Sequence, residues 1–452
     1  MGRGIWTRLA AALSAAAVLT AGCASAEAPP EDVTLKVWSW DGNFNEYAAD
    51  YMAQHPHVKL VRVPPYDETA GFGFDDAYYA NYLQAAEAAQ PDVLMVPARE
   101  FVRLAEAGKL RSLESFVARP EFEASTYSPH VLSLLRASGD GELFGVSQGF
   151  YNQALYYNKT LFESYGVTMP QAGLSWDAVL ELAASFPAGE GEGGVAGYFV
   201  GKYDTLRPWR LIETIGLAAG LEYADGENRS FLVDTDAWAA VWSKVLEGYA
   251  SGTVLELAGE RELNALGDPM PFGPEEQYGP FLEGRAAMTL QDAAFADILA
   301  ERDVPFEWGV VSEPVDPALA EGVSMQPGHP YAIFHTSGQV EEAWRLIAFL
   351  TKRAIGERIS AFGTLTARTN AASAADPAYA PFYEPAPSAH GAYKQLIRRD
   401  VPDAALGRFL ELADERFADT LEGRLTVEEA LSRLAEEATA AWRSLPAEGG
   451  AP

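Results

Sequence analysis

Short β-branched runs alternate with helical stretches from residue 33 onward, and this alternation most limits the folds open to the chain. Val33–Trp40 and Val58–Val63 are β-rich runs separated by a helical stretch. Pro91–Val96 is predicted to be a third, buried strand, and Phe101–Leu110 follows it with a helical pattern. Strands that alternate with helices predict βαβ units and a mostly parallel sheet. The expected fold class is therefore α/β.

The alternation continues through the middle of the chain and then gives way to helices. Strands are expected in the segments ELFGVSQG, ALYYN and GVAGYFV, which all lie between residues 142 and 200. Helices are expected at Trp176–Ser185 and Leu206–Leu217, and later at Val340–Thr351 and Val427–Trp442. The chain is long enough for two or three domains.

Aromatic and polar side chains follow the first three expected strands. They are Trp40 and Asp41, then Tyr66 and Glu68, then Arg99 and Glu100. Ligands of open α/β sheets bind outside the carboxyl ends of the strands. A flat ring suits the C–H face of a sugar, and charged groups or amides suit its hydroxyls. The pattern favours a carbohydrate site, whereas the plain alternative is that these rings are core and these charges are solvated.

Composition excludes several functional classes. The chain has 33 Lys plus Arg against 64 Asp plus Glu, a formal net charge of −31, which repels nucleic acid and anionic lipid head groups. Its one cysteine cannot form an internal disulfide, and its six histidines show no metal-ligand spacing. We expect no metal site, no cofactor and no nucleic acid partner.

The amino terminus has the layout of a secretory signal. Residues 1–22 contain Arg3 and Arg8, no acidic residue, and the apolar run Leu9–Ala21, which is shorter than the roughly 20 residues that span a bilayer. One interpretation is a signal peptide that ends near a cysteine by chance. The other is that Leu19–Cys23 resembles a bacterial lipoprotein box, so that Cys23 carries lipid such as palmitate and residues 23–32 form a tether.

Several longer motifs resemble the family 1 extracellular solute-binding proteins, the sugar-binding components of ABC importers. The most specific is the segment from GELFGVSQ to VLELAASF, Gly141–Phe186. The others, in order along the chain, are PDVLMV with AEAGKL, FLEGRAAMTL, WGVVSEP, EEAWRLIAFLTK and EGRLTVEEALSRL. The resemblance runs from about Val33 to Trp442.

This resemblance implies a two-lobe periplasmic-binding-protein-like fold of type II, hinged, with the ligand cleft between the lobes. Lobe one would comprise residues 33–146 plus 327–369, and lobe two residues 147–326 plus 370–452. The crossovers between them would fall near Gly145–Phe150, Gly322–Gln326 and Arg368–Ala375.

The resemblance also implies ligand contacts. From lobe one and the first crossover these are Trp40, Asp41, Asn43, Arg99, Glu100, Gln148 and Tyr151. From lobe two and the later crossovers they are Tyr203, Asp204, Arg207, Trp209, Gln291, Asp292, Gln326 and Arg368. Trp40 and Trp209 would stack on sugar faces. The chain departs from the family in having Ala293, Ala294 and Phe295 where a tryptophan is common.

The implied function is capture of a mono- or oligosaccharide outside the cell and its delivery to ABC permease subunits by a monomeric, lipid-anchored protein. A secreted glycoside hydrolase is the main rival, because 64 acidic residues could supply a catalytic pair. The sequence has no GxSxG, HExxH or phosphate-loop motif to support other catalysis. A non-sugar ligand such as a glycerophosphate is a further alternative.

Overall fold

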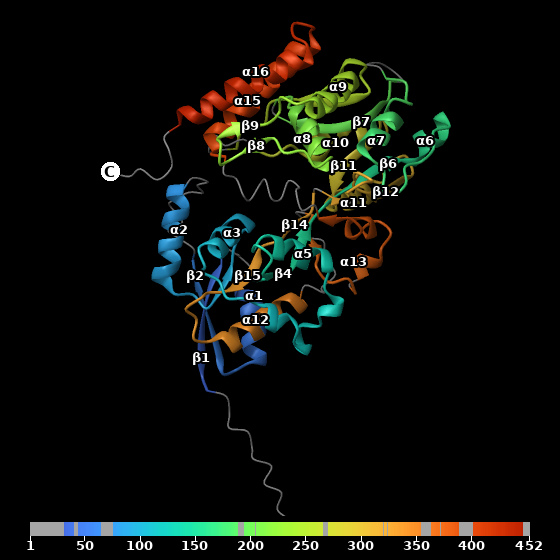
Figure 1. The fold of residues 1–452 in the computed structure, drawn as a ribbon. Helices are drawn as coiled ribbons and strands as arrows, with labels where there is room; N and C mark the ends of the chain where they lie inside the picture. Colours follow the sequence, from blue (N-terminus) through green and yellow to red (C-terminus); the bar gives the residue numbers. More distant parts are fainter. Residues whose placement is uncertain are drawn as a thin grey trace, which may run out of the picture.

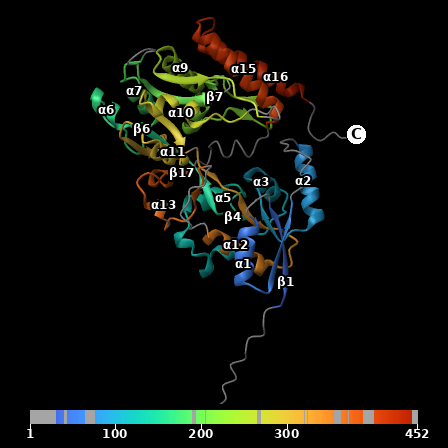
Figure 2. The ribbon, with the colours of Figure 1, turned by 180° about the vertical axis from the view of Figure 1, so that it is seen from behind.

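Two five-stranded sheets organise the chain in the computed structural model, and each forms the centre of one body in Figures 1 and 2. The residues described are 31–39, 44–64, 76–188, 194–203, 205–264, 270–319, 321–322, 324–353, 363–370, 372–387 and 401–445. The sheets and the helices between them confirm the expected α/β class.

The first sheet has the strand order β2-β1-β3-β15-β4. Its strands are β1 (Val33–Ser39), β2 (Val58–Val63), β3 (Val93–Met95), β4 (Gly145–Ser147) and β15 (Pro330–Ile333). β1, β2 and β3 are parallel, as expected from the alternation, whereas β15 runs antiparallel to both β3 and β4. The chain therefore returns to this sheet, after building the second one, to fill the gap between β3 and β4.

The second sheet has the order β10-β7-β11-β6-β12. Its strands are β6 (Gln153–Asn158), β7 (Ala196–Tyr203), β10 (Val254–Ala258), β11 (Ala286–Asp292) and β12 (Trp308–Ser312). β10, β7 and β11 are parallel, and β6 is antiparallel to its neighbours β11 and β12.

Helices cover both sheets. Around the first lie α1 (Phe44–Gln54), α2 (Asp76–Ala89), α3 (Ala98–Glu106), α4 (Glu114–Val117), α5 (Pro129–Ala137) and α12 (Val340–Arg353). Around the second lie α6 (Lys159–Tyr165), α7 (Trp176–Ala183), α8 (Trp209–Ala218), α9 (Asp236–Ala250), α10 (Pro274–Leu282), α11 (Ala294–Arg302), α15 (Asp403–Leu421) and α16 (Val427–Ser444). The smaller elements are η1 (Pro120–Phe122), η2 (Ala124–Thr126), η3 (Ala380–Tyr383), α13 (Ala372–Ala375) and the two-residue strands β8 (Ala224–Asp225), β9 (Ser230–Phe231), β13 (Glu321–Gly322) and β17 (Ala386–Pro387).

Local sequence explains several helix boundaries. The hydroxyl of Ser175 accepts from the Ala178 N–H at the start of α7, and Thr426 with Glu429 forms a capping box on α16. α8 begins at Trp209, later than the predicted Leu206, because Pro208 stands at its N-cap. α3 ends at Glu106, before the predicted Leu110.

A small three-stranded sheet, β14-β5-β16, lies where the chain passes between the two large sheets. β5 (Gly149–Tyr151) connects β4 to β6 and pairs with both β14 (Gln326–Pro327) and β16 (Leu365–Thr366). Three passages of the chain, far apart in sequence, are thus held side by side by backbone hydrogen bonds.

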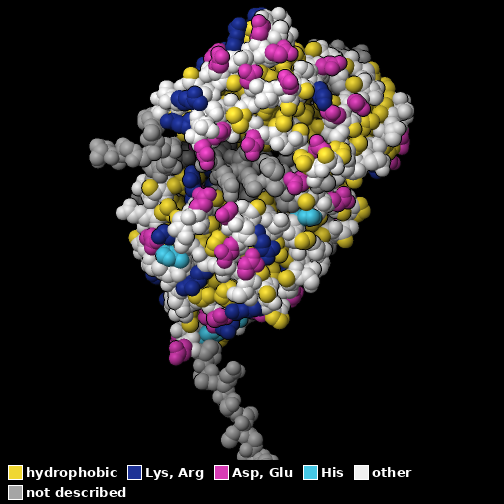
Figure 3. Space-filling model, in the orientation of Figure 1, with side chains coloured by type: hydrophobic (Ala, Val, Ile, Leu, Met, Phe, Trp, Pro, Cys, Tyr) yellow, Lys and Arg dark blue, Asp and Glu magenta, His cyan; other side chains and the backbone are white. Residues whose placement is uncertain are grey.

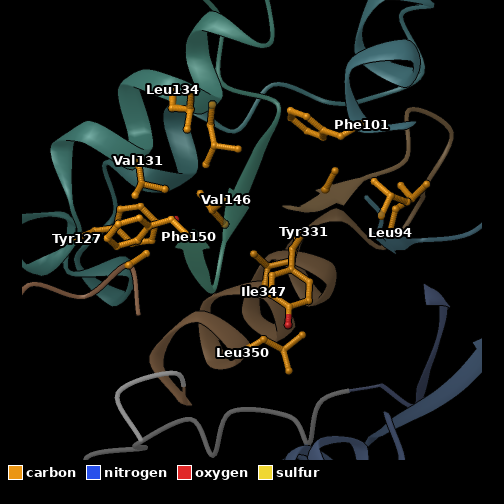
Figure 4. Packing of buried hydrophobic residues seen from close by; sticks show 14 of the residues in the cluster. Leu94, Phe101, Tyr127, Val131, Leu134, Val146, Phe150, Tyr331, Ile347 and Leu350 are labelled. Atoms are coloured by element: carbon orange, nitrogen blue, oxygen red, sulfur yellow. The ribbon is translucent and has the colours of Figure 1, made fainter. Parts of the chain in front are cut away.

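Each body has a dense interior. Leu94, Val146, Tyr331, Ile347 and Leu350 pack between the first sheet and α12 (Figure 4). The second body instead has an aromatic core on one face of its sheet, composed of Trp209, Trp238, Trp242, Phe409 and Trp442. Each such side chain contributes roughly 1.5–3 kcal/mol when it is fully buried. Acidic side chains are scattered over the visible surface of both bodies (Figure 3).

Candidate ligand-binding site

The register of the first sheet fixes which residues share the edge at which its parallel strands end. Ser39 at the end of β1 lies opposite Met95 at the end of β3, and Met95 lies opposite Tyr331 of β15. Pro330 lies opposite Ser147 at the end of β4. Residues that follow β1, β3 and β4 therefore emerge at one edge. Among those predicted there, Trp40, Asp41, Asn43, Tyr66 and Glu68 lie outside the described residues, as does Cys23.

Glu100 lies in the first turn of α3, just beyond β3, and is only 5% exposed. Its Oε1 accepts a hydrogen bond from the Tyr78 hydroxyl at 3.2 Å. Burial raises the pKa of this carboxyl, against smaller opposing effects of hydrogen bonds and of Arg99. The Arg99 guanidinium lies 5.8 Å from the centre of the Tyr79 ring. Predicted residues Arg99 and Glu100 thus lie together with two tyrosines of α2.

The crossover sheet brings three further predicted residues together. Gln148 is exposed, and its Oε1 accepts from the Tyr331 hydroxyl at 2.8 Å. Tyr151 of β5 lies directly opposite Gln326 of β14. Both are partly exposed, so their side chains are accessible from solvent.

The second sheet presents Tyr203 and Asp292 at the ends of the parallel strands β7 and β11. Asp292 Oδ1 accepts from the Ala294 N–H at 2.9 Å, and burial raises the pKa of this carboxyl. Gln291 is partly exposed and donates to the Thr289 hydroxyl at 2.9 Å. Gly363, with φ +73°, packs so closely on Asp292 that a Cβ would come within 2.8 Å of its Cγ.

The predicted lobe-two residues on and next to the loop between β7 and α8 differ in their exposure to solvent. Arg207 is exposed, and Asp204 lies outside the described residues. Trp209 is only 1% exposed, stacks on Trp238 at 5.4 Å and meets Phe409 edge-on at 4.8 Å. A ring enclosed in this way offers no face to a ligand, so Trp209 belongs to the core and not to the stacking surface that we expected.

Arg368 is also placed differently from the prediction. It is 1% exposed, and its guanidinium lies against the neighbouring rings of Phe122 and Tyr127, 4.8 and 5.1 Å from their centres. It donates to the carbonyls of Phe122 and Glu123 and to the Thr126 hydroxyl at 2.8–3.2 Å. All of these acceptors belong to the protein itself, so Arg368 holds the crossover segment in place and is not exposed to a ligand. We call this arrangement the Arg368 clamp.

A polar cluster beside the β7–α8 loop was not predicted. Glu256 of β10 is 7% exposed and accepts from the Arg207 backbone N–H at 3.1 Å and from the Tyr249 hydroxyl at 2.6 Å. Asp414 of α15 lies close by, and burial raises the pKa of its carboxyl to about 6. The signal for Glu256 was a lone charge within the apolar strand VLELA, whereas Asp414 carried no local signal.

The described part of the chain contains no helix that is both long enough and apolar enough to cross a membrane.

Comparisons with known proteins agree with this architecture. A sequence profile described as bacterial extracellular solute-binding protein matches residues 38–357. A Brucella abortus protein that carries a binding-protein name is 23% identical over 279 residues, which is 58% of each chain. The match thus spans little more than half the length of this curated relative.

Solved structures share the fold over most of the chain. The sugar-binding protein MalE from Xanthomonas citri is 17% identical, with a TM-score of 0.59 and coverage of 91% of this chain and 97% of its own. An ABC substrate-binding protein from Listeria monocytogenes in complex with cycloalternan is 18% identical, with a TM-score of 0.53 and coverage of 91% and 99%.

These likenesses confirm the expected α/β fold of the type II periplasmic binding proteins. Two α/β bodies, a crossover sheet between them and a family profile over residues 38–357 lead to one conclusion: the chain belongs to the bacterial extracellular solute-binding protein family.

Proposed function

We propose that this protein is the extracytoplasmic substrate-binding component of an ABC importer, and that it captures a carbohydrate and delivers it to membrane permease subunits. The observation that carries the proposal is that polar and aromatic side chains lie at or just beyond strand ends of both large sheets and on the crossover sheet. These side chains are Arg99, Glu100, Gln148, Tyr151, Tyr203, Arg207, Gln291, Asp292 and Gln326.

The chemistry of these side chains suits a polyhydroxylated ligand. Carboxylates, amides and guanidinium groups can donate to or accept from hydroxyls, and tyrosine rings can cover an apolar sugar face. The family and the solved sugar-binding neighbours support the same function. Trp40, Asp41, Asn43, Tyr66, Glu68 and Asp204 remain proposed contacts on the strength of the sequence.

The lobes would close on the ligand by bending at the crossover sheet. We assign residues 33–146 and 327–369 to lobe one, and residues 147–326 and 370–452 to lobe two. Short paired segments such as β5 and β14 can change their backbone angles while both large sheets stay intact. The protein would act as a monomer and would leave ATP hydrolysis to another subunit.

A thermal-shift screen of residues 24–452 with mono- and oligosaccharides tests the proposal. A sugar that binds the folded protein, at a free concentration of 100 times its Kd, adds about 2.7 kcal/mol to the free energy of unfolding. Chromatography of each mixture after overnight incubation must show the sugar unchanged. Cleaved sugar would support a glycoside hydrolase. A thermal shift with glycerophosphates and with no sugar would mean that the ligand is a glycerophosphate and not a carbohydrate.

Trp40→Ala tests the proposed stacking contact. Loss of a buried aromatic anchor should weaken sugar binding by about 1–3 kcal/mol in calorimetry. Unchanged affinity would place the site elsewhere.

The anchor is a separate proposal. We expect Cys23 to become the lipidated amino terminus after removal of residues 1–22. Radiolabelled palmitate fed to expressing bacteria should label the wild-type protein and not Cys23→Ala. Equal labelling of both would refute the anchor and leave the sugar site untouched.

A further inference from the structure

We infer that Glu256 is a positioning residue, which holds the loop at residues 205–208 in the orientation that presents Arg207 to a ligand. Tyr249 and Asp414 complete the arrangement. The effect on a ligand rests on the proposed function, whereas the effect on the loop can be measured without any ligand.

The backbone aims Glu256 at this loop through an irregularity in the sheet. β10 pairs with β7 in parallel, but the register shifts between Leu255, opposite Phe199, and Glu256, opposite Gly201. β-Bulges of this kind redirect side chains near functional sites. Gly201 has φ +140°, a backbone conformation almost restricted to glycine. The sheet is therefore deformed at the position from which Glu256 extends.

Both carboxylate oxygens of Glu256 hold neighbouring elements. Oε1 accepts from the Arg207 N–H at 3.1 Å, which fixes the loop just before α8. Oε2 accepts from the Tyr249 hydroxyl at 2.6 Å, which ties the carboxylate to α9. Hydrogen bonds to an ionised acceptor are roughly twice as strong as those between neutral groups. Arg207 is thereby held through its backbone, so its exposed guanidinium is not consumed by the contact with Glu256.

Charged groups surround Glu256 on each element packed against it. Arg207 belongs to the loop, Arg210 to α8 and Asp414 to α15. Arg210 lies over the Tyr203 ring, 3.6 Å from its centre, and so connects the cluster to the end of β7. Tyr198 and Tyr203 of β7 lie near enough to the Tyr249 hydroxyl to affect its pKa. Two carboxylates, two guanidinium groups and three phenols thus form one cluster, to which Arg207 of the loop belongs.

The cluster is costly for folding, which argues against a purely structural role. Burial raises the pKa of both Glu256 and Asp414, so their ionised forms are less favourable in the folded protein than in the unfolded chain. Asp414 Oδ1 is buried and accepts no hydrogen bond from any residue that the structure describes. Apolar side chains would fill the same volume without this cost. The ionised carboxylates are instead suited to orienting Arg207 and Arg210.

Amide hydrogen exchange of the unliganded protein tests the positioning role. Glu256→Gln keeps the side-chain shape and removes the charge. We expect the protection of the Arg207 amide at pH 7.5 to fall about tenfold, and that of the α9 amides to stay unchanged. Tyr249→Phe should cause a smaller fall of about threefold, because the carboxylate loses one restraint. Protection is expressed relative to the intrinsic exchange rate at each pH.

The pH dependence separates positioning from simple destabilisation. Burial raises the pKa of Glu256, so on acidification the wild type should lose its Arg207 protection at a higher pH than an exposed glutamate titrates, and then match Glu256→Gln. Glu247→Gln, the same exchange at an exposed position of α9, is the matched control and should change nothing. Equal loss of protection in the loop and in α9, or an Arg207 amide that is unaffected by Glu256→Gln, would overturn the proposal.

Maltose binding measured by calorimetry at pH 7.5 provides the ligand readout. If maltose binds the wild type, Glu256→Gln should weaken binding about tenfold and Glu247→Gln should not. A normal maltose affinity in Glu256→Gln, together with a loosened loop, would show that the loop does not serve the ligand site. If maltose does not bind the wild type, this carbohydrate is excluded as ligand, and the exchange experiment still decides the positioning role.

Discussion

Two regions of the molecule bury charge in opposite ways. Around Arg368, a buried guanidinium lies against two aromatic rings and donates to acceptors of the protein itself. Around Glu256 and Asp414, one oxygen of Asp414 accepts no hydrogen bond from the residues that the structure describes, and arginines that contact solvent lie nearby. The first region holds part of the fold together, whereas the second places two buried carboxylates next to the loop at residues 205–208. The comparison teaches that burial alone does not tell a charge that holds the fold together from one beside a candidate site, and that the groups around each charge must be compared.

The largest expected effect is at the clamp. Arg368→Met would leave the buried Phe122 carbonyl without its donor, would remove one of the donors to the Glu123 carbonyl, and would remove the cation from the rings of Phe122 and Tyr127. Together these losses should lower the free energy of unfolding by about 3–5 kcal/mol. Arg368→Lys keeps a charge but loses the planar contact with the rings, and should lose about half as much. Urea denaturation measures both. A loss below 1 kcal/mol for Arg368→Met would remove the distinction between the two regions.

A smaller effect is expected where the sheet is deformed. Gly201→Ala would force a Cβ to within 3.1 Å of the Tyr203 ring at φ +140°, and should cost about 1–3 kcal/mol. The same urea titration applies, and Gly407→Ala on α15, where a Cβ meets no atom within 4 Å, is the control. Equal stability of wild type and Gly201→Ala would show that the bulge is easily remodelled.

Asp414→Asn should raise the free energy of unfolding, whereas Arg368→Met should lower it. Burial raises the pKa of Asp414 to about 6 in the folded protein, whereas in the unfolded chain this pKa is about 3.9. The ionised side chain therefore destabilises the folded protein increasingly as the pH rises from about 3.9 to above 6. With allowance for solvent screening, removal of the charge should gain about 1–2 kcal/mol at pH 7.5 and almost nothing at pH 4. Thermal denaturation at the two pH values checks this. A gain that is equal at both would refute the titration of Asp414.

The smallest effect is expected at a surface ion pair. Arg119 donates to both carboxylate oxygens of Glu341, at 2.6 and 3.0 Å, but both side chains are exposed to solvent. Glu341→Gln should cost less than about 1 kcal/mol, and the loss should shrink further in 1 M salt. A large, salt-independent loss in urea titrations would mean that exposure is a poor guide to the strength of an ion pair here.

Sequence patterns determined much of the architecture because they act over a few residues. The run Val58–Val63 became β2 without change, and the polar start Ser175 before Trp176 became the N-cap of α7. The strands, the helices and the family resemblance needed no distant contact to be recognised. The edge residues Glu100 and Tyr203 were also predictable, since their places follow from where β3 and β7 end.

Only the tertiary structure decided which candidates are inside and which groups meet. Trp209 and Arg368 occupy positions that the sequence predicted for a site, yet packing by Phe409 of α15 and by Phe122 encloses them. Glu256 and Asp414 became neighbours because α15 folds back over the second sheet. Such contacts join residues more than 100 positions apart, and their energy depends on desolvation, which no local pattern records.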